Sequence, residues 1–169
     1  MTTTPPPAHP GMPTNAGEVL PDWIDGNAHM NVAHYGLQFD RASRAFFRAI
    51  GMDKDYRVRT GLGIFTVEER IVYLGELRLG EGFTVHSRLI GLDDKRVIVL
   101  HEMWRRRDDK LAAFQETLYL HIDRRVRRAA PLSEELLVNL RPLLAAHAVD
   151  ALPARVGQPV ALPKKPASA

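Results

Sequence analysis

The chain has 169 residues, of which 45% are hydrophobic and 25% are charged, and its formal net charge is +3. This length suits one domain with a hydrophobic core, and the small net charge argues against a nucleic-acid-binding protein. The chain has no cysteine, which excludes disulfides, thiolate metal sites and a cysteine nucleophile. No apolar run approaches the ~20 residues of a membrane helix, and the N-terminus lacks the apolar segment of a secretory signal, so we expect a cytoplasmic protein with no membrane partner.

The composition predicts one folded unit between two tails. Residues 1–16 are rich in proline and threonine and predict a disordered N-terminal tail. Residues 151–169 are punctuated by proline and predict a C-terminal tail that is extended over the surface or loose. The folded domain is therefore expected over residues 17–150.

The first elements in chain order are a short strand and a long helix. The segment EVLPDWID, 18–25, predicts the strand. Apolar side chains spaced by three and four residues then predict a helix over 31–50 that ends at Gly51. Its apolar stripe consists of Tyr35, Phe39, Ala42, Phe46 and Ile50.

The second half of the domain predicts an antiparallel sheet. Segments rich in Val, Ile, Phe, Tyr and Leu predict strands over 63–74, 82–92, 95–106 and 110–123. The strand over 95–106 is apolar on both faces, so we expect a helix on one face and a partner subunit on the other. Ser133 predicts the start of a final helix that runs to His147. This order predicts an α+β fold, in which a curved antiparallel sheet wraps one long helix.

Polar side chains concentrate just before the long helix, in WIDGNAHMN. Asp25, Asn27 and His29 occupy alternate positions, and Asn31 continues the series. In an extended backbone they would project to one side, next to the free N–H groups of a helix N-terminus. Turn and capping residues are the simpler interpretation of any one of them. A carboxylate, an imidazole and oxyanion donors together favour acyl transfer or hydrolysis.

This stretch resembles the signature of hot-dog-fold thioesterases of the 4-hydroxybenzoyl-CoA type, which open their central helix with a similar pattern. The spacing D-x-N-x-H also resembles plant acyl-ACP thioesterases. A longer stretch, roughly 18–163, is similar to the thioesterase domain that is fused to some carnitine dehydrogenases and is linked to betainyl-CoA hydrolysis. The chain departs from the family in having Ala28 where glycine is commonest, and it has no dinucleotide-binding G-x-G-x-x-G motif.

The resemblance implies roles for the polar run. Asp25 would be the catalytic carboxylate, either attacking the thioester carbonyl or activating a water molecule. Asn27 would orient the substrate or the water. His29 would bond near the reacting carbonyl or steady the loop.

For three further residues, two possible roles stay open. Asn31 would contact substrate or cap the helix, and Tyr35 would line the pocket or belong to the core. Glu68 is a second candidate catalytic carboxylate; on a regular strand it shares a face with the candidate substrate-binding residue Thr66 and with Arg70. The alternative for Glu68 is a solvated carboxylate paired with Arg70.

The remaining candidates concern the two ends of the substrate. Lys95, Arg96 and the arginines at 124–128 are expected to meet the phosphates of coenzyme A. Trp104 and Tyr73 would either form an aromatic box for a trimethylammonium group or pack in the core.

The histidines lack metal-ligand spacing, so we expect no metal and no cofactor, with coenzyme A entering only as part of the substrate. The resemblance implies a homodimer or a dimer of dimers with the site at the subunit interface. Two alternatives to an acyl-CoA thioesterase stay open: a hot-dog enoyl-CoA hydratase, whose D-x-N-P-x-H motif is longer by one residue, and a non-catalytic acyl-CoA-binding module.

Overall fold

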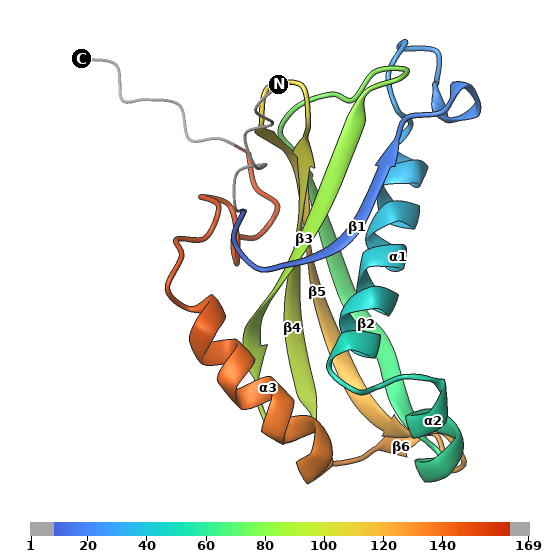
Figure 1. The fold of residues 1–169 in the computed structure, drawn as a ribbon, viewed down its shortest axis with the longest axis vertical. Helices are drawn as coiled ribbons and strands as arrows, with labels where there is room; N and C mark the ends of the chain where they lie inside the picture. Colours follow the sequence, from blue (N-terminus) through green and yellow to red (C-terminus); the bar gives the residue numbers. More distant parts are fainter. Residues whose placement is uncertain (1–8, 163–169) are drawn as a thin grey trace, which may run out of the picture.

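The computed structural model describes residues 9–162 as six strands with three α-helices and one short 3-10 helix. Figure 1 shows the long helix running beside the sheet along most of its length. The elements are β1 (Met12–Glu18), η1 (Pro21–Trp23), α1 (Val32–Ala49), α2 (Lys54–Thr60), β2 (Leu62–Tyr73), β3 (Gly82–Leu92), β4 (Arg96–Arg105), β5 (Lys110–Asp123), β6 (Arg128–Ala129) and α3 (Glu134–His147).

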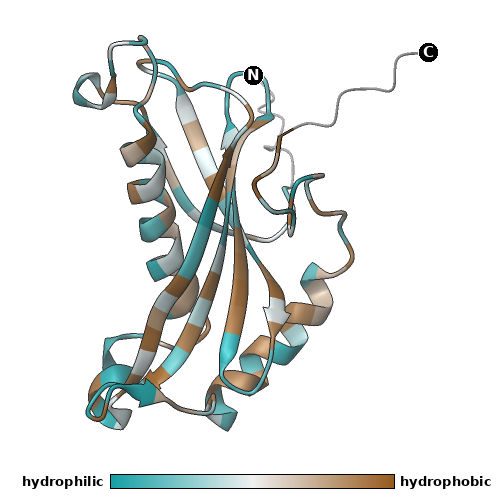
Figure 2. Cartoon of the chain, turned by 180° about the vertical axis from the view of Figure 1, so that it is seen from behind, coloured by the Kyte–Doolittle hydropathy of each residue, from teal (hydrophilic) through white to brown (hydrophobic). Residues whose placement is uncertain are grey.

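The strands form one antiparallel sheet in the order β1-β3-β4-β5-β2, with β6 paired to β5. The predicted apolar stripe of α1 is buried against one face of this sheet, which we call the inner face. Hydrophobic and hydrophilic residues alternate along the strands, whereas the turns at their ends are mostly hydrophilic (Figure 2). The predicted α+β hot-dog architecture, a curled sheet around a long helix, is confirmed.

The long helix, the four long strands and the final helix are confirmed to within one residue. The predicted bounds of the first strand are wrong. It spans Met12–Glu18 instead of 18–25, because Pro21–Trp23 turns as a 3-10 helix while the preceding residues pair with the free edge of β3. Residues 12–16 therefore belong to the sheet and not to a tail, and residues 1–8 lie outside the described part of the chain.

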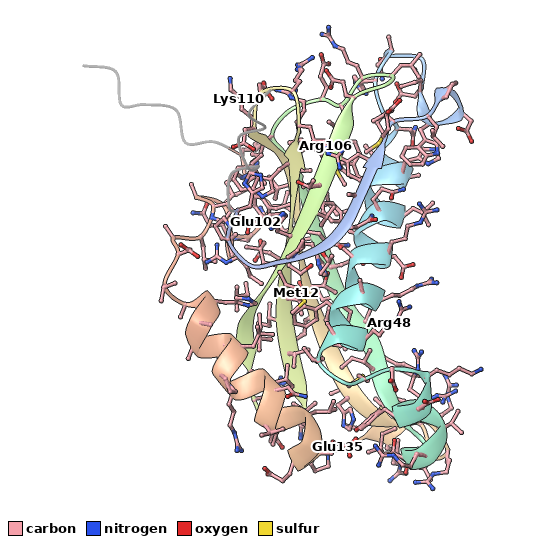
Figure 3. The ribbon with its side chains drawn as sticks, in the orientation of Figure 1. Met12, Arg48, Glu102, Arg106, Lys110 and Glu135 are labelled. Atoms are coloured by element: carbon pink, nitrogen blue, oxygen red, sulfur yellow. The ribbon has the colours of Figure 1, made fainter. Side chains whose placement is uncertain are left out.

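The face of the sheet opposite α1, the outer face, is covered by the chain's own C-terminal segment. Arg88 on β3 is fully buried and donates hydrogen bonds to three backbone carbonyls at and just after the end of α3, those of His147, Asp150 and Ala151. Val156 then packs against the buried cluster that contains Leu100 on β4. Glu102, labelled in Figure 3, lies under this segment. The C-terminal segment thus covers the part of the outer face around Leu100, while Ile98 on the same side of β4 stays exposed.

Helix α3 extends the inner layer beside the end of α1. Leu136 and Leu140 pack with Phe46 and Ile50 in one buried cluster. The predicted N-cap Ser133 is in place, but its hydroxyl contacts the hydroxyl of Tyr56 instead of a helix N–H. Among the helices described between residues 9 and 162, none is long and apolar enough to cross a bilayer.

Candidate active site

The polar run forms the tip of a small hairpin just before α1. Ile24 and Met30 pair as an antiparallel bridge, and the N–H of Asp25 donates to the carbonyl of His29. The Asp25 carboxylate accepts the N–H of Asn27 at 2.8 Å and so closes the turn. The expected extended backbone, with side chains 25, 27 and 29 on one side, is therefore wrong: the turn leaves Asn27 exposed and brings Asp25 and His29 together.

Ala28 occupies the position where the family most often has glycine. Its φ is 62°, in the left-handed region that costs an L-residue free energy. Its N–H donates to the carbonyl of Asp25, which holds this conformation. The turn thus adopts a glycine-type geometry with an alanine.

Asp25 and His29 form a carboxylate–imidazole pair that solvent can reach. Oδ1 of Asp25 lies 3.8 Å from Nδ1 of His29, and their side chains are 22% and 32% exposed. Glu76 lies close enough for the charge of His29 to act on it: its pKa is lowered, chiefly by its bond to Arg78 and further by His29. The hairpin therefore offers one carboxylate and one imidazole at the positive end of α1.

Asn31 and Tyr35 have structural contacts that match their simpler interpretations. Asn31 is the N-cap of α1 and accepts the N–H of Ala33 at 2.9 Å. Tyr35 is buried, and its hydroxyl accepts the N–H of Leu77 at 3.1 Å. Burial raises the pKa of Tyr35 to about 12, so this hydroxyl keeps its proton at neutral pH.

A cavity of about 680 Å³ lies beside α1, between that helix and strands β2 and β5. The Asp25 hairpin does not line it. The hairpin lies near the Tyr73 end of β2, where Tyr35 contacts Tyr73, and the cavity extends toward the start of β2. The side chains that matter for its chemistry are Asp40, Arg44, Arg48, Thr66, Glu69, Gln115 and Tyr119.

A β-bulge in β2 decides which glutamate faces this cavity. Thr66 pairs with Tyr119 and Glu68 pairs with Leu118, so Val67 is an extra residue in β2. The bulge puts Glu68 on the outer side, and Glu69 takes the place beside Thr66 at the cavity. The expectation that Thr66 and Glu68 share a face is therefore wrong. Glu69, which sequence reasoning missed, is the carboxylate that β2 turns toward α1.

The alternative for Glu68, an ion pair with Arg70, is also absent among the described residues. Arg70 instead pairs with Glu116 on β5 at 2.8 Å, and it donates to the carbonyl of Arg155 in the C-terminal segment.

A chain of buried hydrogen bonds leads from the cavity across the inner face of the sheet. The hydroxyls of Tyr119 and Ser43 are 2.6 Å apart, and Ser43 Oγ is 3.0 Å from Nε2 of His101. Nδ1 of His101 lies 2.6 Å from Ser87 Oγ, which is 2.7 Å from Thr14 Oγ1 on β1. Burial lowers the pKa of His101 to about 3, so its ring is neutral.

The predicted phosphate-binding residues Lys95 and Arg96 lie in a turn that already supplies their counter-charges. Arg96 pairs with Asp93 at 2.6 Å and Lys95 with Asp94 at 3.8 Å. Backbone and side-chain hydrogen bonds from Lys95 and Arg96 lower the pKa of Asp93 to about 2. Their assignment to substrate binding stays a prediction.

Another cluster of basic side chains lies next to the cavity, in a second hollow of about 310 Å³ that shares Arg57 and Ile64 with it. Arg124, one of the predicted arginines, lines this hollow together with Lys54 and Arg57.

Of the two alternatives for Trp104 and Tyr73, the aromatic box does not form. Tyr73 packs edge-on against Tyr35 on the inner face, whereas Trp104 stacks on His9, with ring centroids 4.2 Å apart. Trp104 pairs with Leu111, a member of the outer-face cluster, so the two rings lie on opposite faces of the sheet.

Residues 19–140 match the family model described as the thioesterase-like superfamily. A betainyl-CoA thioesterase from Pseudomonas aeruginosa is 33% identical over 145 residues, covering 86% of this chain and 91% of the relative. An L-carnitine dehydrogenase/betainyl-CoA thioesterase from Rhizobium meliloti is 31% identical over 126 residues, which cover 75% of this chain but only 25% of that longer protein.

Two solved structures share the fold over 93% of this chain. A Staphylococcus aureus protein solved in complex with CoA is 26% identical, with a TM-score of 0.84 and 99% of that chain covered. A putative thioesterase from Pseudomonas putida is 32% identical, with a TM-score of 0.78 and 100% of that chain covered.

Proposed function

Because the chain belongs to the thioesterase-like superfamily and is a thioester hydrolase, we propose that it hydrolyses a small acyl-CoA in the cytoplasm, with Asp25 as the catalytic carboxylate. The acyl group is of the betainyl or another short-chain type, in line with the relatives that are betainyl-CoA thioesterases. The products are the free acid and CoA. The reaction requires no metal and no cofactor.

The observation that carries the proposal is the Asp25 hairpin. It holds a partly exposed carboxylate next to an imidazole, at the end of α1 where the helix dipole stabilises negative charge. As nucleophile, Asp25 would form a mixed anhydride as the C–S bond breaks and CoA leaves, and water would then hydrolyse the anhydride to the free acid and restore the carboxylate. As general base, it would take a proton from the water that attacks the carbonyl, and the C–S bond breaks as CoA leaves with a proton. His29, at 3.8 Å, orients the carboxylate or the substrate.

A second copy of the chain completes the site in this proposal. Strand β2 is at the edge of the sheet, and its edge carries exposed apolar side chains that include Phe65 and Val67. An unpaired edge of this kind favours pairing with another strand. Antiparallel pairing of two β2 strands about a two-fold axis puts the end of one beside the start of the other. The Asp25 hairpin of one subunit would then face the cavity of its partner.

The test is release of CoA from a panel of acyl-CoAs, read with a thiol reagent; the chain has no cysteine of its own to react. We expect Asp25→Asn to lower kcat by ~100-fold or more. The fold should persist, because the amide oxygen can still accept the N–H of Asn27. Asp22→Asn, an exposed carboxylate change in η1, is the matched control and should leave kcat unchanged.

The same assay separates the alternatives. An enoyl-CoA hydratase changes the enoyl absorbance without releasing thiol, and a binding module does neither. Full thiol release by Asp25→Asn would exclude the proposed role of Asp25.

A further inference from the structure

The bulge at Val67 aims one carboxylate at the cavity. Without the extra residue, strict alternation would put Glu68 beside Thr66; with it, Glu69 pairs with Thr117 on the inner face and lines the cavity. Bulges next to functional sites commonly redirect a side chain in this way.

A buried amide holds the Glu69 side chain in place. Nε2 of Gln115, a residue only 3% exposed, donates to Oε2 of Glu69 at 3.0 Å. This bond is the one side-chain partner that Glu69 has among the described residues, and no ion pair joins it to them. Its negative charge is therefore available to a ligand.

The other two acids of the cavity are already engaged. Asp40 pairs with Arg44 at 2.6 Å, and Asp53 caps α2 by accepting the N–H of Tyr56 at 2.8 Å. Each has a protein partner that would have to be replaced before it could serve a ligand.

The Glu69 side chain lines the cavity from an exposed position, and its charge acts on the buried Tyr119. The pKa of Tyr119 is raised mainly by burial, and the negative charges of Glu69 and Asp40 raise it further. The two remaining arginines lie at the other end: Arg48, labelled in Figure 3, is two helical turns beyond Asp40, about 12 Å along α1, and Arg57 lies on α2.

We propose that Glu69 is a specificity-determining residue that selects acyl groups carrying a fixed positive charge, such as a quaternary ammonium. Such a group cannot donate a hydrogen bond, so it is recognised by an unpaired carboxylate and by aromatic rings. The rings of Phe47 and Tyr119, 4.8 Å apart, supply the apolar part of the wall. The inference rests on the thioesterase function proposed above and adds the chemistry by which the acyl group is chosen.

The decisive experiment compares two thioesters of equal shape, betainyl-CoA and tert-butylacetyl-CoA, in which carbon replaces the charged nitrogen. Wild type should show the higher kcat/KM for betainyl-CoA. We expect Glu69→Gln to lower kcat/KM for betainyl-CoA by about tenfold or more, which is ~1.4 kcal/mol, and to change it for tert-butylacetyl-CoA by less than about twofold. Glu68→Gln, the same change one residue away on the other side of β2, should alter neither.

Equal hydrolysis of both thioesters by wild type would overturn the assignment, and so would an equal loss for both in Glu69→Gln; each leaves the thioesterase function standing. An equal loss in Glu68→Gln would show that the effect is not a property of the cavity. If wild type releases CoA from neither substrate nor from any other acyl-CoA in the panel, the proposed function fails, and the inference fails with it.

Discussion

Ala28 keeps the turn before His29 in a left-handed conformation that an L-residue adopts at a cost. Glycine at this position would relieve the cost, so we expect Ala28→Gly to raise the free energy of unfolding by about 1 kcal/mol. Urea denaturation measures the change. Ala33→Gly, in the first turn of α1 where the backbone is helical, should have the opposite sign. Destabilisation by Ala28→Gly would mean that the alanine methyl makes a contact worth more than the strain.

The sequence does not directly predict which of Glu68 and Glu69 faces the cavity, because that depends on the bulge at Val67. Val67 is an ordinary strand residue, so nothing in its identity marks a bulge. The positions of the apolar residues do indicate a bulge. Ile64 and Ile71 both lie toward α1, although they are an odd number of residues apart. A regular strand would place two such residues on opposite faces. The Asp25 motif, by contrast, can be recognised because its residues are contiguous, and the turn that shapes it is the simpler of the two interpretations that the sequence offers.

At the scale of elements, β3 and β4 bury an ion pair beneath the C-terminal segment. Nη1 of Arg88 lies 3.7 Å from Oε2 of Glu102, and both side chains are almost fully buried. Burial raises the pKa of Glu102 to about 7, and the opposing attraction of Arg88 does not offset it. Arg88 also binds the last carbonyl of α3 and two carbonyls that follow it. The charge on Glu102 is thus connected to the docking of that segment.

This pair predicts a pH dependence. The folded pKa of Glu102 lies above the ordinary value of 4.5, so between pH 4.5 and 7 the folded state binds more protons than the unfolded state and loses stability as pH rises. We expect Glu102→Gln to remove this loss, so that the free energy of unfolding of the variant minus that of wild type grows by about 1–3 kcal/mol across the window. Urea denaturation from pH 4.5 to 8 measures it. The histidines are present in both proteins, so their effects cancel in this difference. A difference that does not change with pH would therefore refute the raised pKa of Glu102.

The elements that can be predicted from the sequence are those with a long segment of regularly placed apolar residues. Elements that form only by pairing with a neighbouring element could not be predicted. The 18-residue α1 and the four long strands follow from periodicity. The strand β1 has a sequence, MPTNAGE, with little strand propensity; it is held by pairing with β3. The short α2 did have signals, an Asp53 N-cap and Gly61 at φ 72°, but only seven residues between them.

At the scale of the whole molecule, the edge strand β2 predicts self-association. We expect wild type to sediment as a dimer or larger species, and Val67→Lys to weaken this state, because like charges at a two-fold edge repel. Thiol release should fall with it, since the Asp25 hairpin and the cavity would belong to different subunits. Val138→Lys, at another exposed valine on α3, is the control. A fully active wild-type monomer would rule out the shared site.

The buried chain from Tyr119 to Thr14 can be satisfied in two directions. In one, Ser43 donates to Nε2 of His101, Nδ1–H of His101 donates to Ser87, Ser87 donates to Thr14, and Thr14 donates to the carbonyl of Val85. In the other, Thr14 donates to Ser87, Ser87 donates to Nδ1 of His101, Nε2–H of His101 donates to Ser43, and Ser43 donates to the carbonyl of Phe39. The two orders correspond to the two neutral tautomers of His101 and require no heavy atom to move. A charge beside Tyr119 favours one order over the other. The nitrogen chemical shifts of His101 therefore register the charge in the cavity at a ring that no ligand can touch.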